Sequence, residues 1–377
     1  MRVWIINPFD NLPLEGYRPM RFWLMSEAFA RAGHEVVYWT ADFSHANKAP
    51  RAILPDAPQP PFRVVQLHEP PYRRNVSIAR LLAHRAWAKA WTKAVAAEPA
   101  PAVIVMSSPP LGIGAEVRAY AATCGAKIVV DVMDDWPGTF ERVVPRLLLA
   151  PLRRLARANY RAASAITVVS DRYAELVREY GFKGPVRRFY HGIALGGEDA
   201  AAATGTALVY IGNLGRTYDL TTVIEALQYL PGVTLDIAGE GEQLPALKEL
   251  ARTLGAPVRF HGYLAGGRLA QLLAASSIGI VPMLPESCVG IPYKFADYSR
   301  QGLAIVSSLG GESGRLLARY GAGAAYRGGD PQNLAATIRA LVPKLAAAQR
   351  GARLMAEREF DAAAIYAEYV AWVERLG

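Results

Sequence analysis

Residues 290–311 read GIPYKFADYSRQGLAIVSSLGG, and this stretch decides the fold class. A Gly-Ile-Pro turn leads into an amphipathic helix that starts near Tyr293. Gly302 ends this helix, since glycine readily adopts the left-handed conformation that terminates helices, and the apolar residues 304–307 predict the next strand. A helix followed at once by a short buried strand is one repeat of a parallel α/β sheet.

The start of this helix predicts a site for a diphosphate. A helix N-terminus offers unpaired backbone N–H groups and a positive dipole end, here at Gly290 and Ile291. Lys294 on the first turn adds a positive charge for the same phosphates, and Asp297 follows three residues later on the same helix face. A carboxylate at that place can accept hydrogen bonds from both hydroxyls of a ribose. The alternative is an ordinary amphipathic helix with a hydrogen-bonded surface aspartate.

The same alternation of strand and helix runs through the chain. Short apolar runs predict strands at residues 3–6, 35–40, 103–106, 127–131 and 165–169, and again at 207–211, 234–238, 258–261, 278–281 and 304–307. Amphipathic stretches separate them, and the small residues of 192–205 predict a linker. The sequence therefore predicts an α/β protein of two Rossmann-like domains, residues 1–191 and 192–361, with parallel sheets and an inter-domain cleft.

The composition is that of a globular protein with unevenly distributed charge. Of the 377 residues, 52% are hydrophobic and 20% are charged, and no apolar run approaches the roughly 20 residues that cross a bilayer. The first residues lack the features of a signal peptide. Cys124 and Cys288 give neither a zinc spacing nor a disulfide framework, so we expect reduced thiols in a cytoplasmic protein. Residues 1–190 hold 26 basic and 16 acidic side chains, whereas residues 191–377 hold 16 and 17, which predicts an anionic partner for the first half.

The segment around residues 292–302 is similar to the donor-binding segment of glycosyltransferase family 4, which has the GT-B fold. The family pattern Pro-Ser-Lys-x-x-Glu-Tyr-x-x-x-Gly is matched by Pro292, Lys294, Asp297, Tyr298 and Gly302. The resemblance implies that Asp297 binds the ribose, with an aspartate in place of the usual glutamate. Many members also have a glutamate that contacts the donor sugar, and here Val289 occupies that position.

Further segments follow in the order and spacing of the family. Residues 208–220, LVYIGNLGRTYDL, resemble the first turn of its C-terminal domain, where Gly212, Asn213 and Arg216 are expected beside the donor phosphates. Residues 237–243 come next. Residues 258–264, VRFHGYL, resemble the stretch beside the nucleobase, which implies a site near Phe260, Gly262 and Tyr263.

The first half supplies three further candidate segments. In residues 14–19, LEGYRP, Gly16 and Arg18 are expected near the donor phosphates, although glycine and proline also form ordinary turns. In residues 42–48, DFSHANK, His45 is expected to contact acceptor or leaving phosphate with a pKa near neutral, or else to be a packing histidine. In residues 131–137, DVMDDWP, the resemblance places Asp134 near the acceptor hydroxyl. Asp135 is expected to be exposed and Asp131 to be structural.

Two stretches without acidic residues, 70–97 and 142–170, predict a surface that faces an anionic membrane. Basic charge beside apolar or tryptophan side chains is what binding in the membrane interface requires. The side chains expected to contact the membrane or the acceptor are Arg80, Arg85, Trp87, Trp91, Arg153 and Arg157. The alternative is a solvated basic face with the tryptophans in the core.

The resemblance implies a retaining glycosyltransferase that moves a sugar from a nucleoside-diphosphate sugar to a lipid-linked glycan acceptor, expected to be a polyprenyl diphosphate, in surface polysaccharide biosynthesis such as that of lipopolysaccharide. No metal or other cofactor is expected, because Arg, Lys and helix dipoles can neutralise the leaving diphosphate. The helix at about residues 362–377 is expected to pack back on the first domain. The protein is expected to be peripheral on the inner face of the cytoplasmic membrane.

Two alternatives stay open at this point. One is a nucleotide-sugar 2-epimerase with the same fold, and the other is a non-catalytic nucleotide-binding protein that keeps the fold. No nucleic acid is expected as a partner, because no recognised binding motif accompanies the basic charge.

Overall fold

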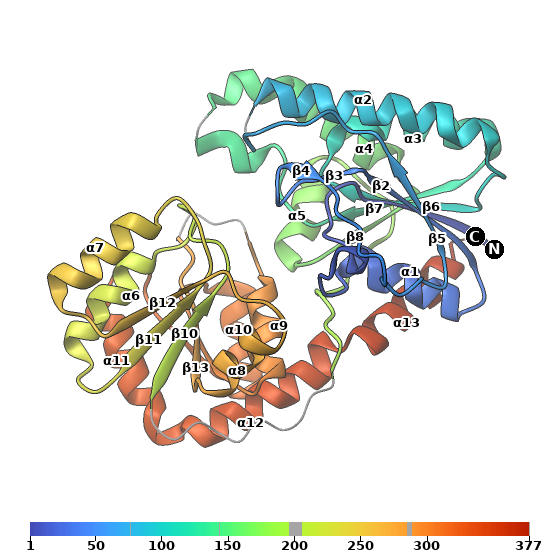
Figure 1. Ribbon diagram of the computed structural model, residues 1–377. Coiled ribbons are helices and arrows are strands. Elements are labelled where there is room, and N and C mark those ends of the chain that lie inside the picture. The colour runs from blue at the N-terminus through green and yellow to red at the C-terminus, as the bar shows by residue number, and fades with distance from the viewer. Residues whose placement is uncertain (76, 143, 196–205, 285–288, 377) are drawn as a thin grey trace. The chain divides into compact units, whose positions relative to one another are not determined.

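The computed structural model describes residues 1–75, 77–142, 144–195, 206–284 and 289–376 (Figure 1). Residues 196–205 of the expected linker and Cys288 lie outside the described residues. The chain forms two compact units, unit 1 with Met1–Tyr190 and Ala362–Gly377, and unit 2 with His191–Asp361. The boundary between the units lies one residue before the one expected from the sequence.

Unit 1 is built on a parallel sheet with the strand order β5-β2-β1-β6-β7-β8-β9. The strands are β1 (Arg2–Ile6), β2 (Glu35–Ala41), β5 (Arg63–Leu67), β6 (Val103–Ser108), β7 (Lys127–Val132), β8 (Ala165–Val168) and β9 (Val186–Arg188). A short antiparallel pair, β3 (Phe43–Ser44) and β4 (Ala49–Pro50), follows β2. The strand order reverses between β1 and β6, and the carboxyl ends of strands at such a switch point are the usual ligand site of these sheets.

Helices cover both faces of this sheet (Figure 1). One face is covered by α2 (Ile78–Ala94), α3 (Gly114–Cys124), α4 (Ala150–Ala162) and α5 (Asp171–Glu179). The other face is covered by α1 (Arg21–Arg31) together with α13 (Ala362–Glu374), so the expected return of this helix to the first domain is present. Tyr369 of α13 packs against Phe29 of α1 and Phe189, with ring centroids 6.2 and 5.0 Å apart.

The tryptophans of α2 belong to the core, which corrects their assignment to a membrane surface. Trp87 and Trp91 are 1% and 0% exposed, and Trp91 packs edge-on against Trp4 and Trp39 of the sheet. The indole N–H of Trp87 donates to the Thr40 carbonyl at 3.2 Å. The spacing of four residues places both rings on one helix face, and that face is the one that packs on the sheet.

A fully buried ion pair joins α1 to the sheet of unit 1. Arg21 donates to both carboxylate oxygens of Asp131 at 2.8 and 2.9 Å, and its side chain also donates to the carbonyls of Phe189 and Tyr190. Asp131 is therefore structural, as expected, and the side chain that it holds is an arginine of α1. Because neither charge reaches water, losing either partner would leave an uncompensated buried charge.

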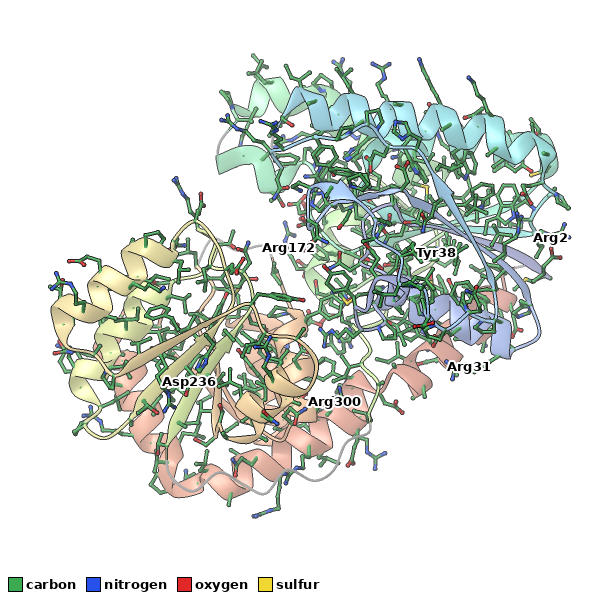
Figure 2. All side chains as sticks on the ribbon, in the orientation of Figure 1. Arg2, Arg31, Tyr38, Arg172, Asp236 and Arg300 are labelled. Atoms are coloured by element: carbon green, nitrogen blue, oxygen red, sulfur yellow. The ribbon has the colours of Figure 1, made fainter. Side chains whose placement is uncertain are left out.

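Unit 2 repeats the same strand order, β12-β11-β10-β13-β14-β15. The strands are β10 (Ala207–Ile211), β11 (Thr234–Ala238), β12 (Val258–Gly262), β13 (Ile278–Val281), β14 (Ala304–Ser307) and β15 (Gly323–Ala325). The helices are α6 (Leu220–Ala226), α7 (Leu244–Leu254), α8 (Gly266–Ala274), α9 (Tyr293–Arg300), α10 (Gly311–Tyr320), α11 (Pro331–Leu341) and α12 (Leu345–Met355). Asp236 on β11 is labelled in Figure 2. It accepts hydrogen bonds from Arg259 and His261 of the neighbouring β12.

The ten predicted strands are all present, and the structure adds β5, β9 and β15 to the two sheets. All three lie at or near a sheet edge, where one side of the strand faces solvent or a loop. Such strands are not continuous apolar runs, and β9 and β15 are only three residues long. None of the described helices is long and apolar enough to cross a bilayer.

Candidate functional site

In unit 2 the switch point lies between β10 and β13, and glycines line the strand ends beside it. The N–H of Gly212, directly after β10, donates to the Ala238 carbonyl at the end of β11. The N–H of Gly239 donates in turn to the Gly262 carbonyl at the end of β12. A Cβ on Gly239 would lie 1.8 Å from the Gly212 oxygen, so only glycine fits there. We call this strip of Gly212, Gly239 and Gly262, with the adjacent Lys294, the glycine edge.

Lys294 carries the positive charge of the glycine edge. Its side chain is buried, and its ammonium lies 4.0 Å from the ring centroid of Tyr218 and 4.9 Å from that of Tyr210. A Cβ on Gly212 would be 3.0 Å from the same nitrogen. Because Gly212 has no side chain, the ammonium lies directly beside the backbone of the loop after β10. Among the described residues, no carboxylate forms an ion pair with it. The arrangement holds a cation on aromatic rings at the strand edge and is suited to an anionic ligand.

Helix α9 is fixed to the end of β10 by Tyr298. The Tyr298 hydroxyl accepts the N–H of Ile211 at 3.0 Å, and its ring lies under Gly279 so closely that a Cβ there would be 2.3 Å away. The helix begins after Pro292, as the sequence predicted, and Gly302 beyond its end has a φ of +67°. The Gly290 carbonyl is held by the Ser313 hydroxyl, and Ile291 is buried. Part-buried Asp297 lies one turn from Lys294.

The other predicted donor residues of unit 2 are less tightly placed. The Asn213 carbonyl accepts the Tyr210 hydroxyl at 2.6 Å, which fixes the loop after β10. The guanidinium of Arg216 is 85% exposed and lies 3.2 Å from the Glu242 carboxylate, so its described partner is an acid of the same surface. Phe260 is part-buried on β12, whereas Tyr263 is exposed. The phosphate and nucleobase roles of these residues stay predictions.

In unit 1 a polar cluster is formed by residues that follow β2 and β5 and by residues of α2. We define it as His45, Lys48, Glu69, Tyr72, Arg80 and His84. His45 Nδ1 lies 2.6 Å from the Tyr72 hydroxyl and 3.3 Å from the Lys48 ammonium. His84 lies 3.9 Å from a Glu69 oxygen and 3.4 Å from Arg80 Nε. Lys48 has a φ of 55°, a conformation that costs a lysine about 1 kcal/mol or more and that recurs at functional sites.

Arg80 is the centre of this polar cluster. Its guanidinium carbon lies 4.6 Å from the Trp136 ring centroid, 5.1 Å from that of Phe9 and 5.9 Å from that of Tyr72. Its side chain also donates to the Asn75 carbonyl at 2.8 Å. The assignment of Arg80 to an exposed membrane surface is therefore wrong, because the arginine is buried among aromatic rings at the start of α2.

Burial shifts the protonation of the polar cluster. Desolvation, followed by the positive charges of Arg80 and Lys48, lowers the pKa of His45 to about 3. Desolvation and Arg80 likewise lower the pKa of His84 to about 3 and that of Lys48 to about 8. Desolvation raises the pKa of Glu69 to about 7, and Arg80 opposes that rise. The expected near-neutral pKa of His45 is thus wrong: the ring is a neutral hydrogen-bonding group at pH 7.

The segment after β7 adds a carboxylate close to the polar cluster. Asp134 Oδ1 accepts the N–H of Asp135 at 2.8 Å and the Thr139 hydroxyl at 3.1 Å. Desolvation raises the pKa of Asp134, and the charge of Arg80 opposes this effect. Asp135 is 7% exposed, so its expected exposure is wrong; its carboxylate lies against Gly138 in the turn that follows. Asp134 can orient an acceptor hydroxyl, and that role stays a prediction.

The remaining residues predicted in unit 1 lie on its surface. Gly16 has a φ of +84° after the short helix η1 (Pro13–Glu15), and Arg18 is exposed in the stretch before α1. Arg85 and Arg157 are exposed on α2 and α4. Arg153 is part-exposed and forms an ion pair with Glu141, so part of the predicted basic surface is neutralised.

Sequence reasoning missed Glu69, Tyr72 and His84. His84 is four residues after Arg80 and three before Trp87, so it shares the buried face of α2, and that spacing could have revealed it. Glu69 and Tyr72 lie in an irregular segment after β5, where no periodic pattern marks burial. Within the described residues, no group of three or more His, Cys, Asp or Glu side chains is arranged to hold a metal ion.

Comparison with known proteins identifies the family. A family model described as "Glycosyl transferase 4-like domain" matches residues 20–191, and one described as "Glycosyl transferases group 1" matches residues 205–343. Together the two models cover most of the chain. The chain belongs to the family 4 glycosyltransferases.

This glycosyltransferase has the GT-B fold, since its two parallel-sheet α/β units match solved glycosyltransferase structures. It is 33% identical over 168 residues to glycogen synthase of Mycobacterium tuberculosis, a match that covers 42% of this chain and 40% of that protein. The chain therefore spans only about 40% of the length of the curated relative it matches.

Two solved structures match nearly the whole chain. Alr3699/HepE of Anabaena in complex with UDP-glucose has a TM-score of 0.69 at 16% identity and covers 100% of this chain and 99% of that chain. WaaG, a glycosyltransferase involved in lipopolysaccharide biosynthesis, has a TM-score of 0.68 at 16% identity and covers 98% and 99%. At such identities the likeness establishes the fold alone.

Proposed function

We propose that this glycosyltransferase transfers a sugar from a nucleoside-diphosphate sugar, held at the glycine edge of unit 2, to an acceptor held at the polar cluster of unit 1. The observation that carries the proposal is Lys294, a buried ammonium without a carboxylate partner among the described residues, beside bare backbone at the switch point. A diphosphate placed there would receive this charge, the N-terminus of α9 and the N–H groups of the loop after β10. The bound UDP-glucose of the HepE structure supports a donor of this class.

The proposed reaction retains the configuration of the sugar and uses no metal. The bond between the anomeric carbon and the diphosphate oxygen breaks, a bond to the acceptor oxygen forms on the same face, and the acceptor proton passes to the leaving diphosphate. Lys294 would stabilise the negative charge that develops on that diphosphate. Asp134 and the neutral His45 would orient the acceptor hydroxyl, because the low pKa of His45 makes it a weak base.

The acceptor is proposed to be a glycan on a polyprenyl diphosphate at the inner face of the cytoplasmic membrane, in surface polysaccharide biosynthesis. The excess positive charge of residues 1–190 supports an anionic membrane partner. Leu147 and Leu148, with exposures of 85% and 67% beside Arg146, support contact of this part of unit 1 with lipid. The similarity of fold to WaaG agrees with such a role.

A thermal-shift screen with UDP, GDP, dTDP, CMP and UMP tests the donor site. One diphosphate should stabilise the wild type by roughly 2–3 kcal/mol at a hundredfold excess over its dissociation constant. Lys294→Met keeps the apolar stem and removes the charge, so it should lose this shift and about 100-fold in transfer rate. Lys344→Met removes an exposed charge elsewhere in unit 2 and should behave as the wild type.

The outcomes separate the proposal from its rivals. An equal shift in wild type and Lys294→Met would put the nucleotide elsewhere, and no shift with any nucleotide would overturn the donor site. Tight binding without transfer to any acceptor would favour the non-catalytic alternative. Conversion of the donor sugar without an acceptor would favour the 2-epimerase.

A further inference from the structure

An apolar groove opens on the surface of unit 1 at the start of α2. Its walls are the first turn of α2 on one side and the segment from η4 (Gly138–Arg142) through η5 (Arg146–Leu149) to α4 on the other. The lining includes Ile78, Leu81, Phe140, Leu148 and Leu152, and the volume is about 310 Å³. That is enough space for part of a hydrocarbon chain.

The exposed side chains of this groove have no evident structural purpose. Ile78 is 76% exposed and Leu148 is 67% exposed, and both line the same opening together with Leu81. Large aliphatic side chains gathered on one exposed patch mark a binding surface more often than chance exposure. The occupant must therefore offer apolar surface.

The charge at the groove selects the kind of occupant. Arg80 lines the groove, and its guanidinium is packed 4.6 Å from the ring centroid of Trp136, which also lines it. Residues 70–97 contain no acid, and Arg73 and Arg74 are exposed just before the start of α2. An apolar groove that is lined by one guanidinium, within a basic stretch, complements a single hydrocarbon chain that carries an anionic head.

Arg80 also connects the groove to the polar cluster, because the same guanidinium lies against Tyr72 and beside His84. A phosphate bound at Arg80 would place whatever it carries next to His45 and Asp134. Arg80 is thus the residue that the groove and the polar cluster share.

We infer that this groove binds the hydrocarbon chain of the lipid-linked acceptor, with the lipid phosphate at Arg80. The identity of the lipid as the acceptor rests on the proposed function. The groove would bind one hydrocarbon chain at a defined place. This differs from the insertion of several exposed leucines into a bilayer. The occupant is the lipid itself, not a second copy of this chain.

Two neighbouring leucines make a matched test. Leu148 lines the groove, whereas Leu147 does not line it and is more exposed. Farnesyl phosphate, below its micelle concentration, serves as the probe in calorimetric titrations of the full chain. Leu148→Asp should weaken its binding at least tenfold, and Leu147→Asp should change it less than twofold. Farnesol and inorganic phosphate should each bind at least tenfold more weakly than the probe, and Arg80→Met should abolish the preference over farnesol.

Equal losses of affinity for farnesyl phosphate in the two leucine variants, or no binding of it to the wild type, would overturn the inference that this groove binds the lipid. Concentration-dependent dimerisation lost in Leu148→Asp would assign the groove to a second copy instead. The nucleotide screen on Leu148→Asp keeps the two proposals apart, because the glycine edge is built from unit 2 alone and its nucleotide shift should persist.

Discussion

The two units use the same strand order and place a buried cation on aromatic rings near the switch point, yet the two cations differ. Lys294 in unit 2 packs on Tyr210 and Tyr218 and has no carboxylate partner among the described residues. Arg80 in unit 1 packs on three rings, donates to the Asn75 carbonyl and sits near Glu69 and His84. Lys294 is held ready for an added anion, whereas Arg80 is already part of a network that any ligand would join. The difference indicates a preformed charge site in unit 2 and a coupled polar site in unit 1.

The sharpest way to break the glycine edge is Gly239→Ala. Its Cβ would lie 1.8 Å from the Gly212 oxygen at a φ of +151°, so the loop after β10 must move, and we expect a loss of about 3 kcal/mol or more in the stability of unit 2. Calorimetric unfolding measures it, and nucleotide binding should disappear as well.

Gly267→Ala is the matched control, since a Cβ there meets nothing within 4 Å on α8. A Gly239→Ala protein that is as stable as Gly267→Ala and still binds nucleotide would show that the close approach of the two strand ends is not required.

The interactions among the titratable groups of the polar cluster in unit 1 can be measured through the pH dependence of stability. The pKa values of His45 and His84 are lowered to about 3, so the unfolded chain binds two more protons below pH 6.5 and stability falls on acidification. The pKa of Glu69 is raised to about 7, so the folded state holds one more proton between about pH 4.5 and 7, and stability there falls as pH rises. The two effects partly cancel, and Asp10, whose pKa is raised by burial to about 6, also opposes the histidines below that pH. Stability should therefore fall on acidification between about pH 6.5 and 6.

Glu69→Gln removes one of the groups that oppose the histidines, so the loss of stability on acidification should become steeper between pH 6.5 and 5. Urea unfolding at a series of pH values measures it. Glu175→Gln, on the exposed face of α5, should leave the slope unchanged. An unchanged slope in Glu69→Gln would mean that the buried glutamate is ionised in the folded protein throughout this range.

The smallest expected effect is that of Arg216→Ala. An ion pair between two exposed side chains contributes little, so stability should change by less than about 0.5 kcal/mol. If Arg216 stays with Glu242 when the donor binds, nucleotide affinity measured by calorimetry should fall less than about threefold. A tenfold fall would instead make Arg216 a phosphate ligand and would show that the loop after β10 rearranges on binding.

The sequence revealed three residues of the glycine edge, because Gly212, Gly262 and Lys294 each lie in a short segment that resembles the family. Gly239 was not singled out. The polar cluster could not be assembled in this way, because His45 follows β2, Tyr72 follows β5 and Arg80 lies on α2, and these segments meet only through the sheet order. The assignment of Arg80 was wrong for the same reason. A basic helix pattern does not reveal which arginine packs against the segments that follow the strands.

The tryptophans of α2 show a further limit of sequence reasoning. Their spacing predicted a shared face, which is correct, but charge on the rest of the helix suggested that this face meets a membrane. The shared face packs on the sheet instead, against Trp4 and Trp39. Packing there is favourable because the protein interior removes both indole rings completely from water. The two most exposed leucines, Leu147 and Leu148, come from η5, a segment without helical periodicity.

The docking of α13 on α1 has a consequence for how the protein is made. Tyr366, Tyr369 and Val373 complete the apolar face beneath β1, yet they leave the ribosome only after residues 191–361. At elongation rates of about 5–20 residues per second, residues 191–361 take roughly 10–30 s to synthesise, and the sheet face beside α1 stays uncovered for at least that time. Unit 2, contiguous in sequence, can finish folding during this interval, so the unit that begins synthesis first is the one that is completed last.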